Sequence, residues 1–106
     1  MSRRIVGDIY GEGLKHFPGK GKKLRSITVE GDKVVAYALG ADDIAFTKAD
    51  VKSLELISGG VLYKDAPGTG GKLAHMNVYR ITFTNGDVGT MRLHVNLEVD
   101  VMMILR

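Results

Sequence analysis

Residues 76–95 constrain the fold of this chain more strongly than any other stretch. Apolar and polar residues alternate on both sides of an Asn-Gly pair, which is typical of a β-hairpin with one apolar face and one polar face. The apolar residues are Tyr79, Ile81, Phe83, Met91, Leu93 and Val95. We therefore expect two antiparallel strands whose apolar face lies on the hydrophobic core.

The length of the turn decides which side chains share a face. A turn of only the Asn-Gly pair would place Tyr79 opposite Arg92, whereas a three-residue turn, residues 84–86 with Gly86 left-handed, places Tyr79 opposite Met91. A slip of one residue exchanges the two faces of a strand. Burial of the apolar residues therefore favours the three-residue turn.

In this register the polar face of the hairpin carries Arg80, Arg92 and His94. We expect an outward-facing polar row there. It is a candidate sheet-face patch for an anion, while an ordinary solvated sheet face explains the same residues. His75 lies on the opposite face from His94, so these two side chains cannot hold one metal ion together. The sequence therefore predicts neither a metal site nor a cofactor.

The part of the chain before this hairpin also has the pattern of short strands. Residues 24–39 predict two strands joined by a Gly-Asp turn, with Glu30 opposite Lys33. The second of these strands is apolar at nearly every residue, which indicates a strand covered on both faces. Residues 44–46 predict a further strand, followed by a single turn capped at Thr47.

Glycine-rich signals divide the middle of the chain. Residues 51–57 predict a strand, and the Gly-Gly pair at 59–60 predicts a tight reversal into residues 61–63. Residues 65–72 have the composition of a loop, and we expect them to be exposed and mobile.

A chain of 106 residues builds one small domain with a single core. We expect an irregular basic lead-in (residues 1–23), a region of antiparallel strands (24–95) and a C-terminal helix (96–106). The last segment is ambiguous, because it has a helical apolar stripe behind an Asn96 cap and also alternates like a strand over residues 97–101. A Met-Met-Ile-Leu run and a terminal arginine favour the helix. The predicted fold class is mainly β (α+β), with antiparallel sheets in a small barrel or sandwich and a short C-terminal helix.

The sequence excludes several classes of function. The chain has no cysteine, which removes disulfides, thiolate catalysis and cysteine-ligated zinc. Residues 66–73 have the glycines and lysine of a phosphate-binding loop, but they end in Leu73 where the motif has Ser or Thr, and they precede a strand rather than a helix. The sequence has no Gly-x-Ser-x-Gly elbow and no carboxylate pair spaced for acid/base work. No enzymatic activity is predicted.

Basic residues are concentrated at one end of the chain. Residues 1–25 contain seven basic and two acidic residues, whereas the remainder contains eight basic and ten acidic. A positive field of this kind attracts phosphate, nucleic acid or an anionic membrane surface, while a solvated basic turn is the alternative. The candidate anion-binding residues are Lys15, Lys20, Lys22, Lys23 and Arg25.

We expect a cytoplasmic protein. No apolar run approaches the roughly 20 residues that span a bilayer. The N-terminal residues also lack the apolar core of a signal peptide.

Three stretches resemble a known family. Residues 13–21 before the first long strand, residues 44–54 with a strand, a turn and the next strand, and residues 79–86 in the hairpin are similar to small bacterial pleckstrin-homology-like (PH-like) domains. The resemblance implies a PH-like barrel or sandwich closed by a C-terminal helix. In lipid-binding members a basic residue followed by a basic-x-Arg triplet binds inositol phosphates, and Lys15 with residues 23–25 has that spacing. Many bacterial members have no assigned activity.

We therefore expect a small non-enzymatic interaction module that binds a protein partner, or associates with itself, through exposed sheet edges. The alternative is an anion-binding module for a phosphoinositide headgroup or nucleic acid, which would use the basic N-terminal loop. Nucleic acid is the less favoured of these two ligands.

Overall fold

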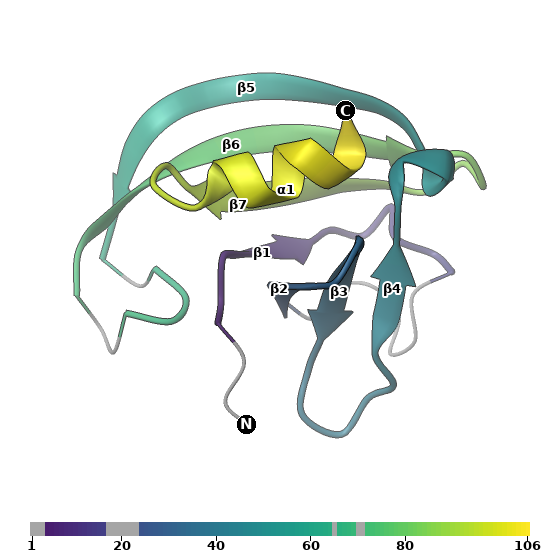
Figure 1. Cartoon of the computed structure of the whole chain (residues 1–106), viewed down its shortest axis with the longest axis horizontal. Coiled ribbons are helices and arrows are strands. Elements are labelled where there is room, and N and C mark those ends of the chain that lie inside the picture. The colour runs from purple at the N-terminus through teal and green to yellow at the C-terminus, as the bar shows by residue number, and fades with distance from the viewer. Residues whose placement is uncertain (1–3, 17–23, 65, 70–71) are drawn as a thin grey trace.

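The computed structural model describes residues 4–16, 24–64, 66–69 and 72–106. Within these residues seven antiparallel strands form one sheet in the order β4-β3-β2-β1-β7-β6-β5, followed by one α-helix (Figure 1). The strands are β1 (Gly7–Tyr10), β2 (Arg25–Glu30), β3 (Lys33–Tyr37), β4 (Ile44–Phe46), β5 (Val51–Tyr63), β6 (Ala74–Phe83) and β7 (Val88–His94). The predicted fold class, a mainly β chain of antiparallel strands with a short C-terminal helix, is confirmed.

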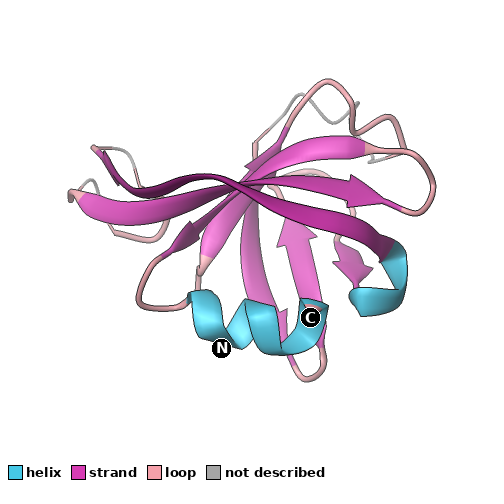
Figure 2. Ribbon diagram, turned by 90° about the horizontal axis from the view of Figure 1, so that it is seen from above, coloured by secondary structure: helices cyan, strands magenta, loops and turns pink. Residues whose placement is uncertain are grey.

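The sheet coils around its own core. In Figure 1 strands β5, β6 and β7 run across the top of the molecule, while β3 and β4 run transverse to them below. Figure 2, seen from above, shows the strong twist that brings the two sets of strands to face one another. Buried side chains from both sets and from the helix make a single core: Val6, Ile9, Leu14, Ile27, Val34, Ala36, Phe46, Tyr79, Ile81, Phe83, Met91, Leu93, Val101 and Leu105.

The register of the β6–β7 hairpin confirms the three-residue turn. Tyr79 pairs with Met91, and Asn77 pairs with Leu93. The Phe83 amide donates a 2.8 Å hydrogen bond to the Asp87 carbonyl, and Gly86 has a φ of 94°, a left-handed conformation that favours glycine. The apolar face of the hairpin is therefore buried, as its sequence pattern predicts, except at Val95, which is 39% exposed.

Shorter predictions on the N-terminal side are confirmed as well. Glu30 pairs with Lys33 across the β2–β3 turn, and consecutive residues of β3 are buried, as expected of a strand covered on both faces. The short 3-10 helix η1 (Lys48–Asp50) follows β4, and the Thr47 amide donates a 3.0 Å hydrogen bond to Asp50 Oδ2. This single turn leads directly into β5.

The tight reversal predicted at residues 59–60 is wrong, because the chain continues through it as one 13-residue strand, β5. The pairing with the 10-residue β6 shifts at three places, so β5 carries β-bulges. Gly60 has a φ of 64°, and its amide donates a 2.8 Å hydrogen bond to Asn77 Oδ1. The glycine pair therefore bends the strand, and Figure 1 shows the resulting arc of β5 over β6.

The lead-in predicted for residues 1–23 contains a central strand. β1 lies between β2 and β7 and pairs with both of them. Leu14 is fully buried and anchors the segment after β1 on the core. Residues 17–23 of the predicted lead-in lie outside the described residues.

The C-terminal segment is a helix, α1 (Glu98–Leu105), as the Met-Met-Ile-Leu run predicts. Val101 and Leu105 are buried in the core. Asn96 is not the cap, because the N-cap position is Leu97, and within the described residues no side chain caps it. Instead the half-buried Glu98 carboxylate holds the helix to β6. No helix in the described part of the chain is long and apolar enough to cross a membrane.

Glu98 joins the first turn of α1 to the inner face of β6. Its carboxylate accepts a 2.5 Å hydrogen bond from the Tyr79 hydroxyl and a second hydrogen bond from Asn77 Nδ2. Burial of the phenol, followed by the hydrogen bond to Glu98, raises the pKa of Tyr79 to about 12. The folded state therefore binds the Tyr79 proton more tightly than the unfolded chain does.

We expect the free energy of unfolding to fall as the pH rises from 10 to about 12, because the folded pKa of Tyr79 lies above its ordinary value. Subtracting the absorbance titration of Tyr79→Phe at the phenolate band from that of the parent isolates the Tyr79 transition. The Glu98→Gln variant should lower the pKa of Tyr79, since it removes the adjacent negative charge. A Tyr79 transition near pH 10 in the parent protein would contradict this.

Candidate functional site

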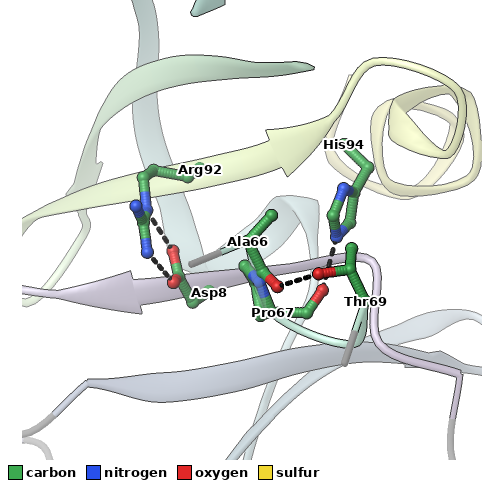
Figure 3. A network of polar contacts seen from close by, with 6 residues as sticks. All are labelled: Asp8, Ala66, Pro67, Thr69, Arg92 and His94. Atoms are coloured by element: carbon green, nitrogen blue, oxygen red, sulfur yellow. Dashed lines mark hydrogen bonds and ion pairs between the residues drawn. The ribbon is translucent and has the colours of Figure 1, made fainter. Parts of the chain in front are cut away.

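A buried ion pair occupies the polar face of the sheet where β1 meets β7. Asp8 and Arg92 are directly opposite residues of these strands. Arg92 Nε donates a 2.7 Å hydrogen bond to Asp8 Oδ1, and an Nη2 hydrogen bond to Oδ2 makes the pair bidentate (Figure 3). The Arg92 guanidinium also lies over the rings of Tyr63, at 4.5 Å, and Tyr10, at 5.6 Å. The hydrogen bond to Asp8 raises the pKa of Arg92 despite its burial.

His94 is covered by the loop between β5 and β6. Its Nε2 donates a 2.6 Å hydrogen bond to the Pro67 carbonyl, and Figure 3 shows the ring directed at that loop. The Thr69 hydroxyl lies 2.8 Å from the Ala66 carbonyl, and Ala66 is buried. Residues 66–69 are a loop as predicted, and Gly68 is exposed, but the predicted exposure is wrong for Ala66, which is buried.

The prediction of an outward-facing polar row is wrong for Arg92 and His94, and holds for Arg80. Arg92 and His94 are buried and already bind protein groups. Arg80 is 58% exposed and lies 3.8 Å from the Glu55 carboxylate. Parity placed these residues on one face correctly, but it could not show that Asp8 and two tyrosine rings cover Arg92 or that the loop covers His94.

The candidate basic residues are not all at the surface. Lys15 is exposed, whereas Arg25 is 1% exposed and donates a 3.2 Å hydrogen bond from Nη1 to the Asp42 carbonyl. Arg25 is therefore part of the interior and does not add to an exposed basic surface. Lys20, Lys22 and Lys23 lie outside the described residues.

Asp87 anchors the segment that leads into the basic loop. The His16 amide donates a 3.0 Å hydrogen bond to Asp87 Oδ2, and His16 Nδ1 lies 2.7 Å from Oδ1. Burial alone would raise the pKa of Asp87, but the hydrogen bonds from His16 outweigh it and lower that pKa. This pair has an evident structural role, since it ties residue 16 to the β6–β7 turn.

The histidines of β6 and β7 do not meet. His94 pairs with Met76, the residue after His75, so the two rings lie on opposite faces as predicted, with His75 exposed and His94 buried. In the described part of the chain no three His, Asp or Glu side chains gather where they could hold a metal ion.

The surface of the described residues has two open cavities. One, of about 220 Å³, is lined by His16, Phe46, Asp50, Phe83 and Asn85 among others. The second, of about 310 Å³, lies beside His94 and the start of α1. Each lining contains a histidine and a threonine; His16 contacts Asp87, and His94 donates to the Pro67 carbonyl.

β5 is the longer of the two edge strands of the described sheet. In the described residues β5 hydrogen-bonds to β6 on one side only, at the end of the sheet. A strand in this position presents backbone N–H and C=O groups that another strand can pair with. Three large apolar side chains of β5 are about half exposed: Leu56, Ile57 and Leu62. The opposite edge strand, β4, has only three residues.

Bulges limit how much of this edge can accept a partner. The β5–β6 register is uninterrupted from Ser53 to Leu56, and it shifts on both sides of that run. Bulges and exposed lysines commonly protect a sheet edge from pairing with another chain. In β5 the exposed Lys52 and Lys64 lie on either side of the strand interior. We call residues 53–56 the β5 window. It is the longest regular stretch of the exposed edge.

Comparison with known proteins returns no match. No family model, no curated protein and no solved structure is significantly similar to this chain.

The Asp8–Arg92 pair should be critical for stability. Replacing Asp8→Ala leaves the Arg92 guanidinium buried without its carboxylate, and we expect the free energy of unfolding to fall by about 3–5 kcal/mol. Urea denaturation followed by circular dichroism measures this change.

The double variant Asp8→Val/Arg92→Met is the control, because it removes both charges and keeps the volume apolar. Its stability should return to the parent value or exceed it. A loss below about 1 kcal/mol for Asp8→Ala alone would contradict the buried-pair interpretation.

Proposed function

We propose that this chain is a small non-enzymatic interaction module that binds a protein partner by adding a strand to the edge of β5. The observation that carries the proposal is a 13-residue edge strand that pairs on one side and exposes large apolar side chains. Main-chain hydrogen bonds would supply affinity, and alternate side chains would supply selectivity. Self-association through the same edge is the second form of this proposal.

Several observations support a binding role over an enzymatic one. The polar groups that looked most available in the sequence, Arg92 and His94, are buried in structural contacts.

The run of antiparallel strands followed by α1 has the element order of PH-like domains, which supports the PH-like proposal. The lack of cysteine supports a reducing, cytoplasmic setting.

Anion binding by the basic N-terminal loop is the weaker proposal. Of its candidate residues Lys15 is exposed, but the burial of Arg25 removes one charge from the set. A phosphoinositide headgroup would therefore rely on lysines alone. Lysine binds phosphate as a point charge and lacks the bidentate geometry of arginine.

The Leu56→Lys variant tests the β5 edge, and Leu39→Lys is the matched control. Both leucines are exposed, at 54% and 94%, but Leu39 lies in the turn after β3. Random extended peptides are selected on the immobilised parent protein, and their affinities are measured by fluorescence anisotropy. A bound peptide would cover the Leu56 side chain, so Leu56→Lys would place a charge in that contact. We expect this variant to weaken binding about tenfold, while Leu39→Lys leaves the affinity unchanged.

Light scattering over a range of protein concentrations separates the two forms of the proposal. A mass that rises to that of a dimer in the parent protein, and not in Leu56→Lys, supports self-association. A strict monomer that selects no peptide overturns the proposed function. Equal affinity of the selected peptides for Leu56→Lys and the parent overturns it too.

A further inference from the structure

We propose that the β5 window takes a short extended segment in which a lysine or arginine lies opposite Glu55, between two apolar residues opposite Leu54 and Leu56. This inference rests on the proposed function, because it names the chemistry of the partner strand at the same edge. It follows from the faces, the charges and the bulges of β5.

The faces of the window set the alternation. Leu54 pairs with Ile81 and Leu56 pairs with Tyr79, so both leucines lie on the face that carries the core. Directly opposite residues of neighbouring strands share a face. A partner strand would therefore place its own apolar residues beside Leu54 and Leu56, and their contact would cover the half-exposed Leu56 side chain.

Glu55 sets the charge of the central residue. It pairs with Arg80 on the other face of β6, and the two side chains are 65% and 58% exposed at a separation of 3.8 Å. Such an exposed pair is weak, so the carboxylate keeps the capacity to accept a second cation. A basic partner residue would extend the pair into a row of alternating charge across three strands.

Neighbouring cations do not reverse this preference. A residue directly opposite Glu55 would lie about 5 Å from it, whereas Arg80, one strand further, would be about 10 Å away. Lys52 is three residues along the strand, which is also about 10 Å. Charges at that distance are largely screened at physiological salt, so the Glu55 carboxylate dominates.

The bulges set the length of the segment. The register shifts between residues 51 and 53 and again between 56 and 58, so the longest run of regular pairing is the window. A partner strand that continued past either bulge would lose hydrogen bonds. This limit favours a short segment over the long edge-to-edge pairing that leads to aggregation.

Three capped peptides that differ only at the centre test the inference: Thr-Val-Lys-Val-Thr and its analogues with Glu or Thr at the central position. Each is titrated into the isotopically labelled protein, and amide chemical shifts give the site and the affinity. We expect shifts at residues 53–56 and an affinity for the Lys peptide about fivefold above that for the Glu peptide, with the Thr peptide between them. The difference should shrink as salt is added.

Charge reversal supplies the decisive comparison. Glu55→Lys should invert the order of the three peptides, while Asp32→Lys, at an exposed turn residue between β2 and β3, should leave it unchanged. If all three peptides shift the β5 amides with equal affinity, the inference is overturned and the proposed function stands. If none of them shifts the β5 amides, both are overturned.

Discussion

The pairing of β1 with β7 is the interaction on which the rest of the structure depends. In the sheet order β4-β3-β2-β1-β7-β6-β5 it is the one junction between the first four strands and the last three. The junction joins residues 84 positions apart in the chain through the Asp8–Arg92 pair. This long-range contact brings the two sets of strands to face one another, with α1 between them. It also leaves β5 at the free edge of the sheet.

Local patterns predicted the elements of this fold, and long-range contacts account for what they missed. The β6–β7 hairpin, the β2–β3 turn and the helical tail each depend on neighbours in sequence, so periodicity and turn residues were sufficient. The place of β1 was not predictable in this way, because Gly7–Tyr10 is only four residues long and its two partners are distant. A lone acid among apolar residues, Asp8, was the one available signal of a buried pair.

The candidate site shows the same division. Parity put Arg80, Arg92 and His94 on one face, but their exposure depends on contacts that are distant in sequence: Asp8 covers Arg92, and the loop at Pro67 covers His94. The β5 edge was missed because the glycine pair was interpreted as a turn. The alternation of Leu54 and Leu56 with Glu55 is visible in the sequence and holds in the structure, because no bulge interrupts residues 53–56; beyond residue 56 the bulges change the phase.

The buried pair at the junction also bears on why the sheet has a single register. An apolar pair at these positions would pack as well in several alignments of β1 against β7, since a shift by two residues keeps every side chain on its face. A shift by two residues would place Asp8 opposite Thr90 or His94 and break its bidentate contact with Arg92, so we expect the pair to favour the observed alignment. The same register places Gly7 opposite Leu93, where an added Cβ would lie 1.9 Å from the Arg92 carbonyl oxygen. Charge and close backbone approach thus both favour the observed alignment of β1 with β7.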